Sequence, residues 1–464
     1  MFKFSSRDGW HRSVIMNKRI LVVGSGAAGM TAASSAREQD AQAEITVVTE
    51  DRYVAYSPCA IPFVIDGTIS DFDSIVMHTP DFYREEKSIE VLTQTKATTV
   101  DIEKKACVLS NGTTRMFDAL VIATGGSVMV PPVEGVRLPG VFGVRSIDDG
   151  KAIQAASISA ITVAIVGAGV IGLEMALAMK KLGKHVIVVE MLPQVVPRIL
   201  DADMAEVVQR HCESKGLRFI LKTPLGKVLG KERVEGIVAG NENIASDMVI
   251  LATGVRPNLE IPNQLGLEIG ALGGVRVSPS LHPYRKGRPM KDLYLAGDVI
   301  MCDSEAINGP TMSQLGSSAV RQGKVAGINA AGGQALYPGS LGSWISQLGD
   351  MQVAGSGLSR GLADYYGVTI AEGKAVGLTR ARYYPGGRQI TVKLMAERSS
   401  RRIVGAQIVG GEEVTGRINW LSGAILARVT VEEFVSNYEN AYCPPTSMVK
   451  DVVVSAAEDL LKKL

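Results

Sequence analysis

The sequence predicts an α/β protein with two parallel sheets flanked by helices, followed by an α+β region at the C-terminus. The pattern Gly-x-Gly-x-x-Gly occurs twice, at residues 24–29 and 167–172. Each copy follows an apolar run typical of a buried strand and opens an alanine-rich run typical of a helix. Near the C-terminus, residues 388–395 and 403–409 alternate as strands do, and residues 414–426 have helical character.

Each glycine pattern belongs to a strand–helix–strand unit that closes on an acidic residue. The first unit ends in the strand 45–49 and Glu50, and the second in the strand 185–189 and Glu190. The glycines allow a tight turn, and the helix N-terminus that follows attracts a pyrophosphate through its unpaired N–H groups. The acidic residue can accept a hydrogen bond from an adenosine ribose. Two complete units therefore predict two Rossmann-like domains, each with a bound dinucleotide.

The rest of the chain continues the alternation of strands and helices. A helix is expected near residues 81–87, and buried strands are expected to end at Gly125, Gly254 and Asp298. The first two of these strands share the ending Ala-Thr-Gly, which indicates that the two domains are built alike. Prolines and a glycine at 131–135 indicate the crossing from the first domain to the second.

Composition disfavours several classes of function. The formal net charge of the 464 residues is +2, without long runs of like charge, so neither nucleic acid nor a membrane surface is an expected partner. No apolar run approaches the length of a membrane span, and residues 1–16 lack the apolar core of a signal peptide. The 5 cysteines and 5 histidines show no metal-binding spacing. We expect a cytoplasmic protein without a metal site, preceded by an N-terminal extension.

The chain resembles the pyridine nucleotide–disulfide oxidoreductase family over essentially its whole length. The resemblance rests on the two glycine patterns and on Glu50, Ala123-Thr124-Gly125, Ala252-Thr253-Gly254 and Ala296-Gly297-Asp298. It implies FAD at the first pattern, NAD(H) at the second, and a homodimer formed through the C-terminal region. The domains implied are an extension at 1–16, an FAD-binding domain at 17–148 and 274–338, an NAD(P)H-binding domain at 149–273, and a dimerisation domain at 339–464.

The cofactor contacts fall on the motifs themselves. The resemblance implies that Asp298 holds the ribityl chain of FAD and that Glu174 lies near the nicotinamide. Glu190 has no cation beside it, and its carboxylate accepts from a free 2′-hydroxyl but repels a 2′-phosphate, which favours NADH. The predicted cofactor residues are Gly24, Gly26, Ala28, Gly29, Glu50, Thr124, Gly125, Gly167, Gly169, Ile171, Gly172, Glu174, Glu190, Gly254, Gly297 and Asp298.

The chemistry is indicated by Cys59, which follows the first unit in Ser57-Pro58-Cys59. No second cysteine is separated from it by four residues, so it resembles the single-cysteine branch of the family, which includes CoA-disulfide, persulfide and polysulfide reductases, NADH oxidases and NADH peroxidases. A thiolate can form a mixed disulfide or persulfide, and a nearby helix N-terminus or oxidised flavin would lower its pKa. We predict an FAD-dependent NADH oxidoreductase that reduces a CoA disulfide, persulfide or polysulfide through Cys59.

Three segments distinguish the members of this branch. The peroxidases and many water-forming oxidases carry a histidine in the first glycine pattern where this chain has Ala27, which disfavours peroxide and oxygen as acceptors. Tyr383-Tyr384-Pro385-Gly386 and Tyr442-Cys443-Pro444-Pro445 resemble elements of the CoA-disulfide reductases. The resemblance implies that Tyr383 and Tyr442 reach Cys59 of the partner subunit and donate hydrogen bonds to a departing thiolate.

Other positions leave the acceptor open. Thr31 and Lys450 match CoA-contacting positions of the family, whereas Val320 replaces a CoA-contacting histidine, with Arg321 beside it as a possible phosphate contact. Pro58 stands where the family often has asparagine. CoA, as bound substrate or mixed disulfide, therefore remains one acceptor among several. Two further alternatives are an NADH oxidase that forms water or hydrogen peroxide, and a non-catalytic flavin redox sensor.

Overall fold

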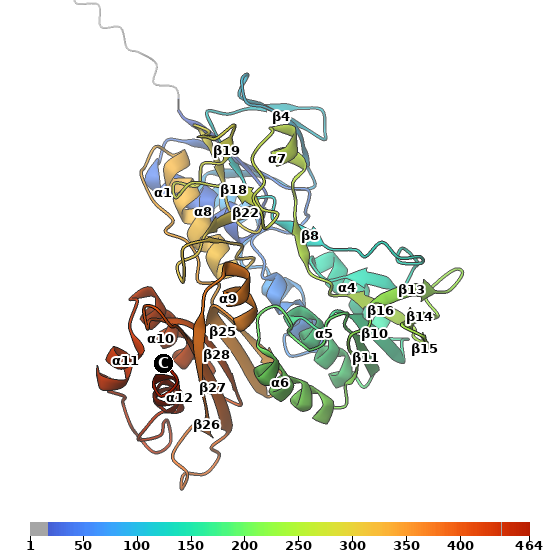
Figure 1. The fold of residues 1–464 in the computed structure, drawn as a ribbon. Coiled ribbons are helices and arrows are strands. Elements are labelled where there is room, and N and C mark those ends of the chain that lie inside the picture. The colour runs from blue at the N-terminus through green and yellow to red at the C-terminus, as the bar shows by residue number, and fades with distance from the viewer. Residues whose placement is uncertain (1–16, 438) are drawn as a thin grey trace, which may run out of the picture.

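A computed structural model describes residues 17–437 and 439–464, and three five-stranded sheets organise it (Figure 1). The extension expected at residues 1–16 lies outside the described residues. The first sheet is parallel, with the order β21-β7-β1-β2-β3. Its strands are β1 (Arg19–Val23), β2 (Glu44–Val48), β3 (Ile89–Leu92), β7 (Ala119–Ile122) and β21 (Leu293–Leu295).

The second sheet is also parallel, and its order is β12-β11-β10-β16-β9. Strand β9 (Val141–Gly143) precedes the domain boundary expected at residue 149, yet it pairs with β16, so the second sheet begins earlier in the chain than the sequence indicated. The other elements are β10 (Thr162–Val166), β11 (His185–Val189), β12 (Arg218–Ile220), β16 (Met248–Leu251), α4 (Ile147–Ser157), α5 (Val170–Lys181) and α6 (Ala202–Ser214).

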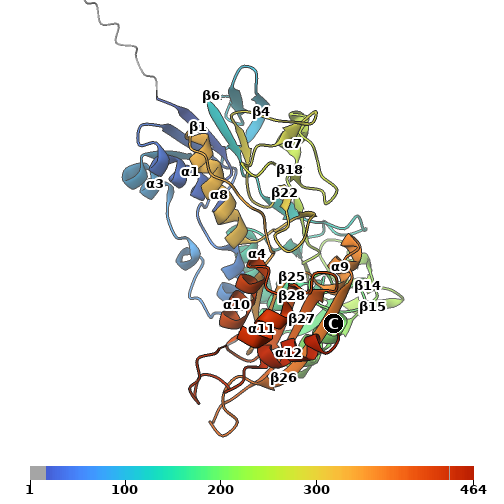
Figure 2. The same cartoon turned by 60° about the vertical axis from the view of Figure 1, so that its left-hand side comes forward.

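The third sheet is antiparallel and lies between the C-terminal helices and α6 (Figures 1 and 2). Its order is β24-β25-β28-β27-β26, and α12 packs on β26 and β27 while α10 packs on β25 and β28. The elements are β24 (Trp344–Leu348), β25 (Met351–Gly357), β26 (Ile370–Leu378), β27 (Gln389–Glu397), β28 (Ile403–Gly410), α10 (Val414–Leu426), α11 (Val431–Asn437) and α12 (Val452–Leu461).

Shorter elements connect the sheets. Those before the second sheet are α1 (Ala27–Gln39), the 3-10 helices η1 (Pro58–Ala60) and η2 (Asp73–Ile75), α2 (Ile61–Ile65), α3 (Pro80–Lys87), β4 (Ala97–Asp101), β5 (Ala106–Leu109), β6 (Thr114–Met116) and β8 (Gly126–Val128). Those that follow are β13 (Leu225–Leu229), β14 (Gly236–Ala239), β15 (Glu242–Ala245), β17 (Val255–Pro257), α7 (Glu260–Gln264), β18 (Val275–Arg276), β19 (Tyr284–Arg285), β20 (Arg288–Pro289), β22 (Ile300–Asp303), β23 (Pro310–Thr311), α8 (Gly316–Ala330) and α9 (Arg360–Tyr366).

Helices α1 and α8 lie against each other because two glycines of α8 face the backbone of α1 (Figures 1 and 2). A Cβ at Gly323 would lie 2.3 Å from the carbonyl oxygen of Ala28, and one at Gly327 would lie 2.1 Å from that of Ala32. Any larger side chain would force the helices apart. The glycines thus fix α8 against the helix that follows the first glycine turn.

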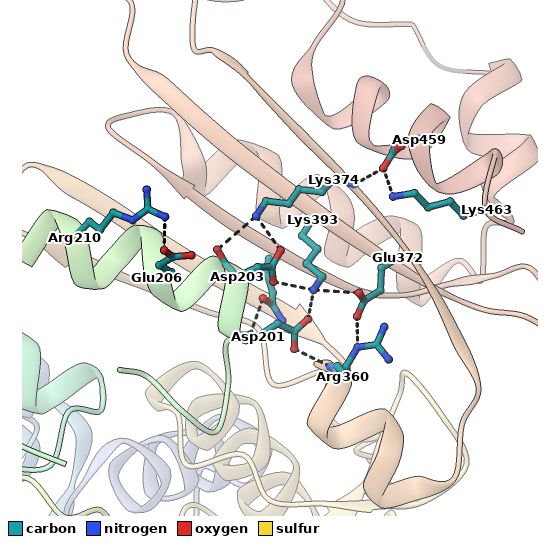
Figure 3. A network of polar contacts seen from close by, with 11 residues as sticks. Asp201, Asp203, Glu206, Arg210, Arg360, Glu372, Lys374, Lys393, Asp459 and Lys463 are labelled. Carbon is teal, nitrogen blue, oxygen red and sulfur yellow. Dashed lines mark hydrogen bonds and ion pairs between the residues drawn. The ribbon is translucent and has the colours of Figure 1, made fainter. Parts of the chain in front are cut away.

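A buried lysine joins α6 to the third sheet (Figure 3). Lys393 on β27 has a side chain only 6% exposed, and its Nζ lies 2.8 Å from Asp201, 3.0 Å from Asp203 and 3.3 Å from Glu372. Burial lowers the pKa of Lys393, but the ion pairs outweigh this effect and hold it above its ordinary value. The two aspartates stand at the start of α6, so the cluster fastens the second domain to the third.

None of the described helices combines the length and apolar character needed to cross a membrane. In the same part of the chain, no group of three or more His, Cys, Asp or Glu side chains is arranged to hold a metal ion.

Candidate active site

The first glycine turn has the geometry that a pyrophosphate requires. Gly24 has a φ of +110°, and a Cβ there would lie 2.1 Å from the carbonyl oxygen of Ala123. A Cβ at Gly29 would lie 1.9 Å from the oxygen of Gly24, so the start of α1 is held tightly against the turn. A Cβ at Gly26, in contrast, would meet no protein atom within 4 Å. The backbone there is open to close approach by a phosphate group.

The second turn repeats this geometry between β10 and α5. Gly167 has a φ of +105°, and its Cβ would lie 2.3 Å from the oxygen of Ala252, while a Cβ at Gly172 would lie 2.0 Å from the oxygen of Gly167. A Cβ at Gly169 would again meet no protein atom within 4 Å. The residues of both turns therefore fit a dinucleotide, and they explain why the pattern recurs with the same spacing.

The acidic residue beside the second turn is held by the backbone. Glu190 is buried, and its two carboxylate oxygens accept hydrogen bonds of 2.8 Å from the N–H groups of Ala168 and Leu192. Each oxygen keeps a further lone pair, which can accept from a ribose hydroxyl. Glu50, at the equivalent place in the first domain, is exposed.

We expect NADH to be preferred over NADPH, and Glu190→Arg to narrow or invert that preference. The carboxylate opposes a 2′-phosphate, and such a like-charge contact costs about 1–3 kcal/mol when partly buried, or roughly tenfold or more in specificity. Glu190→Gln is the matched control, because it removes the charge but keeps an oxygen that can accept from the backbone. The measurement is kcat/KM for both nucleotides, and a wild-type preference for NADPH would refute the argument.

The predicted flavin residue Asp298 is engaged by an arginine that the sequence did not suggest. Asp298 follows β21, and its side chain is 12% exposed, while the guanidinium of Arg145 lies 2.8 Å from it. A Cβ at Gly125 would lie 3.3 Å from the same guanidinium. The N–H of Gly297 donates to Gln322 over 2.8 Å, which fixes the turn before Asp298. Arg145 thus links the ends of β7 and β21.

Cys59 lies in η1 and is one of two exposed cysteines, the other being Cys443. In the structure, the pKa of the Cys59 thiol is raised above its ordinary value. Desolvation by the surrounding protein is the main cause, and the negative charge of Glu174 adds to it, while Arg145 acts in the opposite direction. A lower pKa was expected if a helix N-terminus or an oxidised flavin lay nearby; η1 is only three residues long and supplies little dipole to offset the desolvation.

Glu174 of the second domain belongs to a helix that contacts α2, the helix directly after the Cys59 segment. It lies on α5, and its carboxylate accepts a hydrogen bond of 2.7 Å from Ser346 of β24. Burial raises the pKa of Glu174 to about 7, so its charge changes near neutral pH. Glu174, Arg145 and Asp298 therefore all act on the charge state of Cys59, although the four residues come from separate segments.

The structure also brings together the two tyrosines predicted from the C-terminal motifs. The phenol oxygens of Tyr383 and Tyr442 are 2.5 Å apart, and this hydrogen bond raises the pKa of Tyr442. Both side chains are accessible, at 75% and 41% exposed respectively.

The predicted substrate residues lie on three different helices or helix ends. Thr31 is half-buried on α1. Arg321 on α8 forms an ion pair of 3.8 Å with Glu305 and lies over the ring of Tyr337. Lys450 forms an ion pair with Glu458 of α12. Thr31 and Arg321 lie on helices that pack against each other, whereas Lys450 lies beside α12 in the C-terminal region.

Two glycine turns that suit dinucleotides, together with a free and exposed thiol, define an oxidoreductase that uses two nucleotide cofactors. Residues 18–331 match the pyridine nucleotide-disulphide oxidoreductase family, and residues 347–451 match its dimerisation domain. The chain belongs to this family.

Similar proteins cover nearly all of the chain. A relative from Methanocaldococcus jannaschii, named NADH oxidase, is 44% identical over 454 residues, which cover 96% of this chain and 99% of the relative. One from Pyrococcus horikoshii, named NAD(P)H coenzyme A polysulfide/persulfide reductase, is 31% identical, with coverage of 96% and 99%. The solved NAD-dependent persulfide reductase from A. fulgidus superposes with a TM-score of 0.92 at 33% identity, covering 96% of this chain and 83% of that one.

Proposed function

We propose that the protein is an FAD-dependent NADH oxidoreductase that reduces a CoA disulfide, a persulfide or a polysulfide through Cys59. The observation that carries the proposal is the free, exposed thiol of Cys59, on which the negative charges of Glu174 from the second domain and Asp298 from the first both act. The relatives named persulfide reductases support a sulfur acceptor. We further propose a cytoplasmic homodimer with an FAD-binding domain at 17–148 and 274–338, of which β9 joins the second sheet, an NAD(P)H-binding domain at 149–273 and a dimerisation domain at 339–464.

The chain supplies a nucleophile and proton donors for this reaction. The Cys59 thiolate attacks one sulfur of RS–SR′, so that a Cys59–S–S–R bond forms and R′S⁻ departs. Bound FAD would supply the two electrons, taken from NADH, that cleave this bond and release RS⁻. The cycle restores the Cys59 thiolate and consumes NADH, one proton and the disulfide, giving NAD⁺ and two thiols. With a persulfide or polysulfide, the thiolate attacks a sulfane sulfur, RS⁻ or a shorter polysulfide departs, and reduction of the resulting Cys59 persulfide releases sulfide.

The tyrosine pair is proposed to serve the leaving group. The pair Tyr383 and Tyr442 of one subunit would donate a hydrogen bond to the thiolate that departs from the partner's Cys59. Because the two phenols are already hydrogen-bonded to each other, one can donate outward while it accepts from the other. Thr31, Arg321 and Lys450 remain proposed contacts for the phosphates or the pantetheine arm of CoA.

Turnover of NADH with separate acceptors tests the proposal. CoA disulfide, inorganic polysulfide and oxygen are supplied in turn, and the mass of any adduct on Cys59 is measured in protein as purified. We expect turnover with a sulfur acceptor well above that with oxygen, since Ala27 stands where many oxidases carry a histidine. The second candidate, an NADH oxidase, is favoured by the name of the Methanocaldococcus jannaschii relative. Oxygen turnover that exceeds turnover with every sulfur acceptor would establish it.

Cys443 adds one prediction about the same pocket. It is exposed and adjoins Tyr442, so under the hypothesis that it is a second redox thiol, mild oxidation is expected to link it to Cys59 of the partner subunit. The alternative is that Cys443 is only a small residue without a redox role. Neighbouring side chains on an extended segment point to opposite sides, so Cys443 can point away from the pocket that Tyr442 enters. A non-reducing gel and peptide mass spectrometry detect the link. Oxidised protein without it, together with normal turnover by Cys443→Ala, would leave Cys443 without a redox role.

A further inference from the structure

We infer that Glu412 is a positioning residue that holds the phenols of Tyr383 and Tyr442 beside each other. This inference rests on the proposed role of the tyrosine pair toward the leaving group. Glu412 belongs to no motif in the sequence, and it lies in the turn between β28 and α10. A chain of hydrogen bonds leads from its carboxylate to the segment of the first tyrosine, and from there to the segment of the second.

The carboxylate of Glu412 accepts from two consecutive residues at the start of the first tyrosine segment, residues 379–388. Its Oε1 accepts from the hydroxyl of Thr379 over 2.7 Å and from Nε of Arg380 over 3.0 Å, and its Oε2 accepts from Nη2 of the same guanidinium over 2.6 Å. A bidentate pair of this kind fixes the orientation of the arginine as well as its distance. Burial alone would raise the pKa of Glu412, but these hydrogen bonds outweigh it and hold the pKa below its ordinary value. The carboxylate is therefore charged at neutral pH.

The first tyrosine segment is closed into a loop through the same groups. The N–H of Thr379 donates to the carbonyl of Arg388 over 2.9 Å, and the hydroxyl of Thr379 accepts from the N–H of Arg388 over 2.9 Å. The hydroxyl that donates to Glu412 thus also joins the two ends of the loop. The stem of Arg380 lies close to the returning part of the loop, since a Cβ at Gly387 would lie 3.1 Å from its Cγ. The loop is therefore folded around the arginine that Glu412 holds.

This loop in turn contacts the second tyrosine segment, residues 441–447. The N–H of Ala381 donates to the carbonyl of Pro444 over 3.2 Å, and the phenol oxygens of Tyr383 and Tyr442 lie 2.5 Å apart. In each segment, the residue that makes the backbone contact and the tyrosine are two positions apart. The place of the first loop against the second segment therefore sets whether the phenols can meet.

The second tyrosine segment is anchored to α10 by a different pair. Asp451, which follows this segment, caps α12 and forms a buried ion pair of 2.7 Å with Arg417 of α10. Arg417 also donates to the carbonyl of Thr379 over 3.4 Å. A variant without Glu412 thus keeps both segments attached to α10. It loses only the groups that hold the turn of the first loop.

The first test is the titration of the two phenols, followed through the near-ultraviolet absorbance of phenolate. In each background, the curve of Tyr383→Phe/Tyr442→Phe is subtracted, which leaves the titration of the pair. In the wild type, the hydrogen bond with Tyr383 raises the pKa of Tyr442, so we expect one phenol to titrate above about 10. In Glu412→Ala, we expect both phenols to titrate at about 10, because the hydrogen bond between them is lost.

Glu413→Ala is the matched control for this titration, because it removes the same charge from the next residue, which is exposed. Glu412→Gln provides a second variant if Glu412→Ala does not fold. The amide keeps an oxygen that can accept from Thr379 but lacks the charge that binds Arg380 through both oxygens, so part of the change is expected. Titration of the pair in Glu412→Ala or, where that variant does not fold, in Glu412→Gln that equals titration in Glu413→Ala would overturn the inference.

The second test determines whether Glu412 affects turnover only through the tyrosines. We expect Glu412→Ala to lower kcat/KM with a sulfur acceptor by about tenfold or more, since a misplaced donor is costly in the transition state. In the Tyr383→Phe/Tyr442→Phe background, the same change should have an effect below about twofold. Equal effects in both backgrounds would mean that Glu412 supports the structure in general, and would overturn the inference. If the titration changes but Tyr383→Phe/Tyr442→Phe turns over normally, the proposed role of the tyrosines fails while their positioning by Glu412 stands.

Discussion

Replacing Cys59 with serine is expected to abolish reduction of sulfur acceptors while FAD binding and flavin reduction by NADH remain. A hydroxyl cannot cycle through a sulfur–sulfur bond, so no mixed disulfide or persulfide can form at this position. The glycine turns and Asp298 do not depend on the thiol and should still hold the cofactors. We expect kcat with sulfur acceptors to fall on the order of 10³-fold or more, as is usual when a covalent nucleophile is removed.

Two measurements on the same protein separate these effects. Anaerobic bleaching of the flavin absorbance by NADH reports the first half of the reaction, and thiol or sulfide release reports the second. Ser57→Ala, two residues away in the same segment, is the matched control and should retain both. Sulfur reduction by Cys59→Ser at the wild-type level would remove Cys59 from the reaction, and equal loss of flavin bleaching would indicate a structural defect instead.

The features that local sequence encodes could be predicted, and those that depend on distant contacts could not. The strand before each glycine turn is an uninterrupted apolar run, and Gly24 and Gly167 must adopt positive φ, so both units were identifiable. Strand β9 was missed as part of the second sheet because it is three partly buried residues that carry no periodic signal. Its place is set by pairing with β16, far along the chain.

The same limit applies to the site. Cys59 could be singled out by its position after the first unit, and in the structure it is a free and exposed cysteine. Arg145 could not be, because its partner Asp298 lies 153 positions away and no spacing rule connects them. Tyr383 and Tyr442 were found through the resemblance alone, and their contact across 59 positions has no local signal.

Lys393 illustrates most clearly what tertiary contacts decide. In sequence it is one lysine in a β-strand, where an exposed position would be the ordinary expectation. In the structure it is buried among Asp201, Asp203 and Glu372, which come from the start of α6 and from β26. Asp201 also accepts the N–H of Arg360, so the cluster involves three separate regions of the chain.

Lys393→Met is expected to destabilise the protein by about 3–5 kcal/mol, because removing one partner of a buried ion pair leaves the other charge uncompensated. Asp201 is itself only 6% exposed in its side chain and would lose its cation, while Asp203 would keep Lys374 at 2.8 Å. Ion pairing raises the pKa of Lys393, so the lysine's contribution is present below its unfolded pKa and is lost only as pH rises through its folded pKa. The lysine is thus expected to be charged, and the difference from wild type to persist, from about pH 5 to 9.

The exposed ion pair of Arg210 with Glu206 provides the matched control, because both residues lie on α6, the helix that Lys393 contacts (Figure 3). Arg210→Met removes a cation of similar size from α6, and a surface pair contributes only about 0–1 kcal/mol. Thermal unfolding followed by far-ultraviolet circular dichroism should therefore separate the two variants by several degrees. Equal midpoints for Lys393→Met and Arg210→Met would mean that the Lys393 cluster does not fasten the second domain to the third. A large difference would show that the attachment of α6 to the C-terminal sheet depends on the buried charge of Lys393.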